Sequence, residues 1–225
     1  MEHWQQFWQQ QNYSPIINTP PAVLYGGTHH EPLASIGMSC FLDAVKDKFN
    51  ENFSVIDYGC GTGILSNFIS SRLQNFSYLG LEPNSTHGKE RINLGTEYFN
   101  DPRIKFGFTD NFLNNINDNV DAVILISVFT HMVFEDIKLI LDQLLNVFNS
   151  SPDCTIVFSC FISKLNEPYT VNPQLHIWER FYGESYIALS DLNTYCNENN
   201  VHLEKHMDFE AQGSYIHQIF KITKL

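Results

Sequence analysis

Residues 55–63 read Val-Ile-Asp-Tyr-Gly-Cys-Gly-Thr-Gly, and this stretch decides which fold the sequence predicts. A β-rich run ends at an acidic residue and passes into alternating glycines, and a helix is predicted to follow at 64–73. Glycine suits a sharp turn because it adopts positive φ angles, and it has no Cβ to keep a ligand away from the backbone. In open α/β folds, ligands bind at such turns, at the carboxyl ends of the strands.

Strands and helices alternate along the rest of the chain, as their hydrophobic periods show. Strands are predicted at 54–58, 78–81, 103–108, 121–126 and 155–162, and helices at 64–73, 85–98, 134–148 and 186–199. This alternation predicts a parallel sheet covered by helices on both faces. The last predicted strands, at 201–209 and 215–222, have a short link between them, which suits an antiparallel hairpin.

The chain length favours one domain with added segments. Residues 1–50 are expected to form a helical and loop cap that packs on the core. Residues 51–225 are expected to form the α/β domain. Within it, 163–185 has no clear period and is long for a plain connection, so we expect an insertion on the substrate side.

The composition disfavours several classes of partner. The chain has 13 Lys and Arg against 25 Asp and Glu, a net charge of -12, so a basic face for nucleic acid is not expected. No apolar stretch approaches the ~20 residues of a membrane span. The start lacks the pattern of a signal peptide, so a cytoplasmic location is expected. Five scattered Cys without a C-x-x-C pair argue against a disulfide framework and a structural zinc site. The oligomeric state stays open.

The spacing of the glycines and of a later acid narrows the type of ligand. A dinucleotide fingerprint starting at Gly59 needs a third glycine where the chain has Ile64. A Walker-type Gly-Lys-Ser/Thr run is also absent. Glu82 ends the second predicted strand, close to the ~20-residue spacing after the glycines at which an acid reaches ribose hydroxyls.

These motifs resemble those of the class I S-adenosylmethionine-dependent methyltransferases. Residues 57–63 look like the first motif of that family, and Glu82 looks like its ribose-binding acid. Residues 108–112 fall where members often place an Asp against adenine, and 127–132 are similar to a run that follows the fourth strand in one broad subgroup. The resemblance implies a three-layer Rossmann-like sandwich, with a seven-stranded, mostly parallel sheet whose last strand is antiparallel.

The resemblance also implies the cofactor S-adenosylmethionine and the product S-adenosylhomocysteine (SAH). The implied cofactor-binding residues are Tyr25, Asp57, Gly59, Cys60, Gly61, Gly63, Glu82, Pro83, Asp110, Asn111, Phe112, Ser127 and Val128. Many relatives carry Arg just after the glycines, where this chain has Ile64 and Leu65. The group that holds the methionine carboxylate therefore stays open, and the loop at Tyr25 is one candidate.

The segment after the fourth strand disfavours some acceptors. Enzymes that methylate exocyclic amines of bases resemble one another in an Asn/Asp-Pro-Pro-Tyr/Phe run there, whereas this chain has Ser-Val-Phe-Thr at 127–130. The Pro-Cys pair of cytosine-ring methyltransferases is absent. Metal-assisted catechol-type enzymes have an Asp where this chain has Ser127, so we predict no metal.

His131 is the first candidate for a general base, because it follows the fourth strand and histidine titrates near neutral pH. His217 and the pair His29 and His30 are weaker candidates. The leading hypothesis is transfer of a methyl group to an oxygen or nitrogen of a small molecule, possible examples being a sugar or a secondary metabolite. The alternatives are a catalytically silent cofactor-binding regulatory module and a protein methyltransferase.

Overall fold

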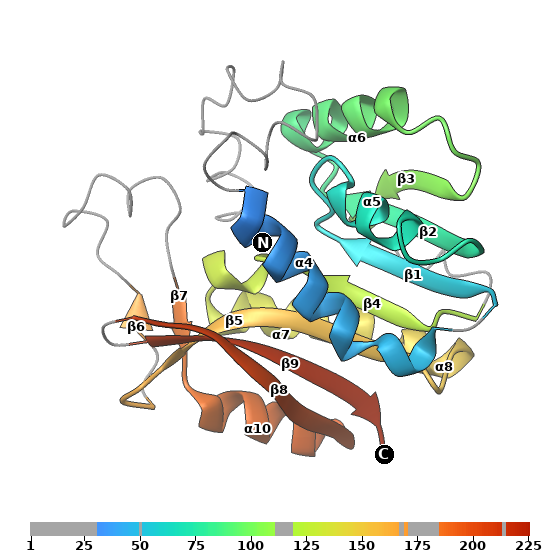
Figure 1. Ribbon diagram of the computed structural model, residues 1–225. Helices are drawn as coiled ribbons and strands as arrows, with labels where there is room; N and C mark the ends of the chain where they lie inside the picture. Colours follow the sequence, from blue (N-terminus) through green and yellow to red (C-terminus); the bar gives the residue numbers. More distant parts are fainter. Residues whose placement is uncertain (1–30, 50, 111–118, 167–168, 171–184, 213–214) are drawn as a thin grey trace.

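The computed structural model describes residues 31–49, 51–110, 119–166, 169–170, 185–212 and 215–225 (Figure 1). In this part of the chain one sheet holds the strands β1 (Phe53–Tyr58), β2 (Phe76–Glu82), β3 (Ile104–Phe108), β4 (Ala122–Leu125), β5 (Thr155–Ser163), β6 (Tyr169–Thr170), β7 (Ser185–Ile187), β8 (Val201–Gln212) and β9 (Tyr215–Lys224). The helices are α4 (Glu31–Ala44), α5 (Ile64–Ser70), α6 (Thr86–Tyr98), α7 (Phe134–Leu144), α8 (Val147–Ser150) and α10 (Leu189–Glu198), with the 3-10 turns η1 (Lys46–Lys48) and η3 (Phe129–His131).

The order of the parallel strands creates a switch point beside β1. The chain passes from β1 to β2 and β3 on one side, and then returns to β4 and β5 on the other side. Asp57 of β1 pairs with Gly80 of β2 and with Ile124 of β4. Crevices at such a switch point, outside the carboxyl ends of the strands, are where open α/β sheets bind ligands. The glycine turn after β1 lies there.

The late hairpin completes the sheet as the sequence predicted. β9 runs antiparallel to β5, from Ile156 opposite Ile222 to Ser163 opposite Tyr215. β8 pairs antiparallel with β9 and forms the outer strand. The predicted mostly parallel seven-stranded sheet with an antiparallel last strand is thus confirmed in β1 to β5, β8 and β9.

Two short strands were not predicted. β7 runs parallel to the last part of β5, where Tyr186 pairs with Phe161, and β6 pairs antiparallel with β7. The helix predicted from residue 186 therefore begins only at Leu189. The reason is that β5 extends past the end of β4, which pairs only up to Phe158, so its free edge takes up a strand. β6 lies within the predicted insertion at 163–185, and β7 begins at its last residue. Residues 171–184 lie outside the described residues.

Helices cover both faces of the sheet, as expected (Figure 1). Alternate side chains of a strand point to opposite faces, so Val55 and Ile56 belong to different cores. One core packs α4 and α5 on the sheet, and the other packs α7, α8 and α10. α6 lies against β2 and β3.

The cap predicted at 1–50 is described only from residue 31 onward. In that part, α4 packs on α5 and β5, and Phe41 and Leu42 are buried. The boundary at residue 50 stays a prediction, and the predicted helix around Trp4 lies outside the described residues. Among the helices that the structure describes, none has the length and apolar character needed to cross a membrane.

Candidate ligand-binding site at the carboxyl edge of the sheet

The turn after β1 is built from glycines in a left-handed conformation. Gly59, Gly61 and Gly63 have φ angles of 78°, 59° and 84°, a region that other residues rarely adopt. The N–H groups of Gly59 and Cys60 both donate to the carbonyl of Leu81, at 2.8 and 3.1 Å. The turn is therefore fixed to the end of β2 before it leads into α5.

Glycine is required at two of these positions by packing as well as by φ. A Cβ on Gly59 would lie 2.6 Å from Cγ2 of Val128, and one on Gly63 would lie 2.6 Å from Cζ of Phe106. From the sequence alone, we expected these glycines to let a ligand approach the backbone. At these two positions the space beside the glycine is filled by side chains from β3 and from the segment after β4.

Asp57 lies beneath the turn and is buried, with 3% of its surface exposed. The hydroxyl of Tyr78 donates to its Oδ2 at 2.7 Å. Burial raises the pKa of Asp57 to about 7, although the hydrogen bond from Tyr78 lowers it, and the charge of Glu82 raises it further. The site thus contains a buried acid that titrates near neutral pH.

Glu82 ends β2 and is also 3% exposed. Its Oε1 accepts a hydrogen bond of 2.6 Å from the N–H of Gly61. Its Oε2 forms an ion pair of 3.3 Å with Arg91 of α6. Burial raises the pKa of Glu82, while Arg91 and the N–H of Gly61 lower it. The ribose-binding acid that the sequence predicted therefore touches the glycine turn directly.

The segment after β4 faces the turn across the switch point. Ser127 has a φ of 56°, which is uncommon for a residue with a Cβ. Its N–H donates to Oγ of Ser159 at 3.2 Å, and its carbonyl accepts from the hydroxyl of Thr130 at 3.0 Å. These bonds hold Ser127 in place. Its side chain is exposed, whereas Val128 is buried against Gly59.

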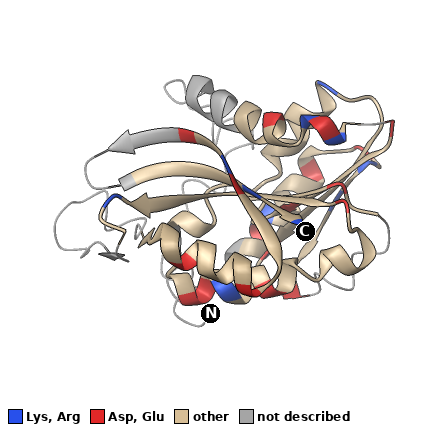
Figure 2. Cartoon of the chain, turned by 90° about the horizontal axis from the view of Figure 1, so that it is seen from below, with Lys and Arg blue, Asp and Glu red and all other residues tan. Residues whose placement is uncertain are grey.

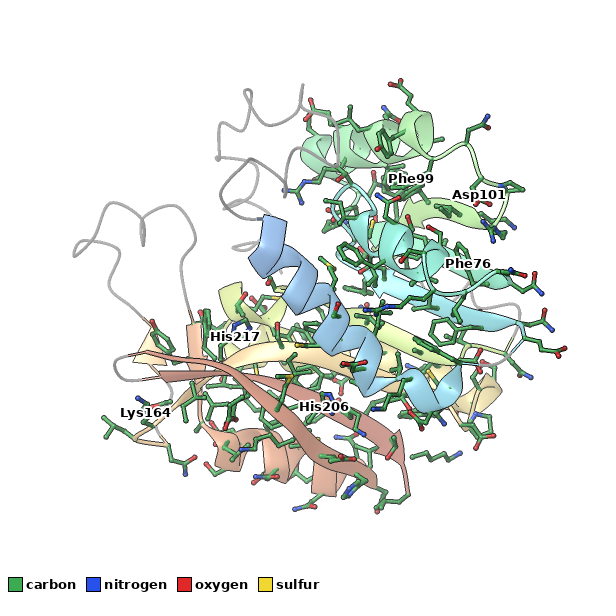
Figure 3. All side chains as sticks on the ribbon, in the orientation of Figure 1. Phe76, Phe99, Asp101, Lys164, His206 and His217 are labelled. Atoms are coloured by element: carbon green, nitrogen blue, oxygen red, sulfur yellow. The ribbon has the colours of Figure 1, made fainter. Side chains whose placement is uncertain are left out.

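A second group of side chains lies farther along the same edge. His217, near the start of β9, lies opposite Phe161 near the end of β5, and their rings are 4.8 Å apart (Figure 3). The ring of Tyr186 from β7 lies 5.8 Å from the same Phe161. Aromatic groups of this kind suit the wall of a small-molecule site.

The fold is similar to those of solved structures that hold SAH. Coclaurine N-methyltransferase, bound to N-methylheliamine and SAH, matches 97% of this chain and 80% of its own with a TM-score of 0.66 and 13% identity. The plantazolicin methyltransferase BamL, in complex with a triazolic desmethylPZN analog and SAH, matches 99% and 95% with a TM-score of 0.66 and 14% identity. The N-terminal domain of EvdMO1, in the presence of SAH and D-fucose, matches 100% and 98% with a TM-score of 0.63 and 12% identity.

No family model matches the sequence, and no curated protein matches it. The similarity to solved structures therefore decides the fold. The chain has the class I methyltransferase fold. The resemblance inferred from the motifs is confirmed at this level.

In this methyltransferase fold, the structure brings several predicted residues together around the switch point. They are Asp57, Gly59, Cys60, Gly61, Gly63, Glu82, Pro83, Ser127 and Val128. The side chain of Cys60 is buried against Gly80, so only its backbone is placed to meet a ligand. Their roles toward a cofactor stay predictions.

The remaining predicted residues are placed less fully. Asp110 is exposed, and its charge adds to the larger effect of burial in raising the pKa of Tyr58 at the end of β1. His131 ends η3, directly after the Ser127 segment, and its side chain is outside the description. Tyr25, His29, His30, Asn111 and Phe112 lie outside the described residues.

Two members of the site were not predicted from the sequence, namely Tyr78 and Arg91. Tyr78 lies on β2 in register with Val55 of β1. A single tyrosine in a predicted strand does not by itself indicate a place in a binding site, so its contact with Asp57 could not be predicted. Arg91 belongs to the short basic group Lys89-Glu90-Arg91, which a solvated helix face explains equally well.

The described residues contain no group of three or more His, Cys, Asp and Glu side chains arranged to hold a metal ion. Lys and Arg residues are scattered among acidic residues over the described helices and strands (Figure 2).

Proposed function

We propose that this chain is an S-adenosylmethionine-dependent methyltransferase that transfers a methyl group to an oxygen or nitrogen of a small molecule. The observation that carries the proposal is the hydrogen bond from the N–H of Gly61 to the carboxylate of Glu82. It joins the acid at the end of β2 to the glycine turn at the switch point of the sheet. Solved structures of the same fold that hold SAH together with a small molecule support it.

The residues around this hydrogen bond fit this cofactor. Glu82 offers a buried carboxylate to ribose hydroxyls, which donate hydrogen bonds to it. Thr62, between Gly61 and Gly63, has a buried hydroxyl oxygen that makes no hydrogen bond to the described residues. Buried polar atoms normally find a partner, so a polar group of a ligand at the turn would satisfy this one.

The chemistry demands mainly positioning from the protein. When bound, the cofactor supplies a methyl group on a sulfonium, a good leaving group. The chain must align the acceptor with that methyl group and exclude water, which can account for much of the rate. The exposed Ser127, beside the turn, lies where donor and acceptor would meet in this proposal.

A base is needed only where the acceptor must lose a proton. The bound cofactor would supply the methyl group, and the base or water would take up the proton that the acceptor loses. We propose His131 for this role because it follows Ser127 by one short turn. His217 is the second candidate, at the same edge of the sheet.

The proposal is tested with cofactor labelled on the methyl group. The purified protein is incubated with a broad metabolite extract and, separately, with a protein lysate, and the labelled products are separated by size. Label in small molecules, lost in Glu82→Gln, is the expected result. Label in proteins would instead favour a protein methyltransferase. Tight cofactor binding without any transfer would favour a silent regulatory module.

A further inference from the structure

The surroundings of Glu82 contain one feature that cofactor binding as proposed above does not itself require, the ion pair with Arg91. The guanidinium NH1 of Arg91 lies 3.3 Å from Oε2 of Glu82. The Arg91 side chain is 31% exposed and that of Glu82 is 5% exposed. A half-buried cation thus reaches a buried carboxylate from a different element, α6.

The Glu82 carboxylate lies in surroundings that oppose its charge, because it is buried. Beside the larger effect of burial, its charge raises the pKa of Asp57 from β1, Cys60 from the glycine turn and Tyr78 from β2. Burial is the main cause that raises the pKa of Glu82. Among the causes that lower it, the charge of Arg91 comes first and the N–H of Gly61 second.

The hydrogen bonds from Gly61 and Arg91 to Glu82 leave room for a diol. A carboxylate has two oxygens with about four lone-pair sites. The N–H of Gly61 uses a site on Oε1, and Arg91 uses a site on Oε2. One site on each oxygen then remains, and a pair of neighbouring ribose hydroxyls has two donors. A protonated carboxyl group would offer fewer acceptor sites and would add a donor of its own.

We propose that Arg91 is a positioning residue of the cofactor site, whose guanidinium keeps the Glu82 carboxylate ionised and oriented to accept both ribose hydroxyls. The inference rests on the proposed function for its ligand. The ion pair itself is formed by the chain's own residues. It adds to the site a residue that acts through Glu82.

The position of Arg91 is fixed by the way α6 is held. Ser85 caps the helix, with its hydroxyl accepting the N–H of Gly88 at 3.0 Å. Gly95, one turn after Arg91, lies so close to Phe106 that a Cβ would be 2.8 Å from the ring. Because α6 is held near both of its ends, the guanidinium of Arg91 is kept close to Glu82.

The first experiment measures the free energy of unfolding as a function of pH without ligand, for wild type, Arg91→Gln and Arg91→Lys. Loss of Arg91 raises the pKa of Glu82 in the folded protein. Stability lost in Arg91→Gln should therefore be largest at high pH and should shrink as pH falls and Glu82 becomes protonated in both proteins. Arg91→Lys should restore part of it. In a Glu82→Gln background the pH-dependent difference should vanish.

The second experiment titrates SAH into the same proteins by calorimetry. At about pH 8.5, Arg91→Gln should bind within about twofold of wild type, and at about pH 6 more weakly, by up to about tenfold for each unit by which the loss of Arg91 raises the pKa of Glu82. Arg72→Gln is the matched control, because Arg72 follows α5 and makes an exposed hydrogen bond to Ser39 of α4. It should follow wild type at both pH values.

Several outcomes separate the two proposals. An equal loss of affinity at both pH values would show that Arg91 touches the ligand or only supports packing, and would overturn the positioning role. So would an Arg91→Gln protein that matches wild type in both experiments. If wild type binds no SAH while the pH-dependent stability difference is present, the ion pair acts as described and the proposed function fails.

Discussion

Single residues of the site are constrained by contacts within the protein itself. Gly59 combines a positive φ with contact against Val128, and Asp57 depends on one tyrosine hydroxyl. A substitution at either position should therefore be visible in stability measurements made without cofactor. Two predictions at this scale use that property.

Gly59→Ala should destabilise the protein, because alanine is strained at a φ of 78° and its Cβ would lie 2.6 Å from Val128. Left-handed strain alone costs roughly 1–2 kcal/mol. Urea unfolding checks the size of the effect. Adding Val128→Ala removes the clash, so the double variant should be less destabilised than the sum of the two single variants. Strict additivity would show that the contact with Val128 plays no part.

Tyr78→Phe removes the hydrogen bond to Asp57 and little else. Losing a hydrogen bond to a charged buried group costs about 1.5–3 kcal/mol. The pKa of Asp57 is about 7, so the cost should be largest above neutral pH and smaller at about pH 5.5, where the carboxyl is protonated. Unfolding at the two pH values gives the comparison. Tyr98→Phe is the matched control, because Tyr98 is 47% exposed.

How much of the site could be predicted from the sequence differs from residue to residue. Gly59, Gly61 and Glu82 could be predicted because few structures other than a ligand-binding turn need those residue types at that spacing. Tyr78 and Arg91 could not, because their roles arise from a parallel pairing and a helix position that bring distant residues together.

At the scale of elements, α6 packs closely on the sheet where glycines leave room for the ring of Phe106. The ring of Phe106 from β3 lies where a Cβ on Gly63, Gly80 or Gly95 would come within 2.6 to 2.9 Å of it. These glycines come from α5's N-terminal turn, from β2 and from α6. The ring therefore connects the glycine turn to the helix that carries Arg91.

Gly95→Ala tests this arrangement through the sign of its effect. In an ordinary helix interior, Gly→Ala stabilises by about 1 kcal/mol. Here the new Cβ would lie 2.8 Å from Cζ of Phe106 and 3.1 Å from the carbonyl of Thr62, so we expect destabilisation. Thermal unfolding decides the sign. Phe106→Leu in the same chain should recover part of the loss, and a stabilised Gly95→Ala single variant would contradict the packing.

Elements with a strong period were predicted to within a few residues, and the clearest error lies at β7. Tyr186 and Ile187 are apolar and continue the pattern of the helix that follows, so nothing local separates them from it. They form a strand because the edge of β5 beyond Phe158 is open to pairing. The edge is open because β5 extends beyond β4. The sequence around Tyr186 carries no information about the lengths of those two strands.

At the scale of the whole molecule, two buried carboxyl groups at one edge of the sheet should shape the dependence of stability on pH. The pKa of Asp57 is about 7 in the folded protein, against 3.8 for an ordinary aspartate. Between these values the folded protein binds more protons than the unfolded chain, so stability should fall as pH rises. The site therefore opposes folding at the pH where we expect it to work.

Asp57→Asn should flatten this profile. A shift from 3.8 to about 7 corresponds to about 4 kcal/mol, at about 1.4 kcal/mol per unit. Wild type should therefore lose stability relative to Asp57→Asn, by an amount of that order, between about pH 4 and pH 8. The free energy of unfolding across that range is the measurement. Asp153→Asn, at an exposed position, should keep the wild-type slope, and a wild-type slope in Asp57→Asn would contradict the assignment.

The measurement that tests the central claim most directly is calorimetric titration of S-adenosylmethionine and SAH into wild type, Glu82→Gln and Glu204→Gln. Glu204 is the matched control, since it pairs with Lys221 on the β8–β9 hairpin. Wild type and Glu204→Gln should bind both ligands alike. Glu82→Gln should bind about tenfold or more weakly, because an amide replaces the carboxylate that accepts both hydroxyls. No binding by folded wild type, or equal binding by Glu82→Gln, would contradict the cofactor site described here.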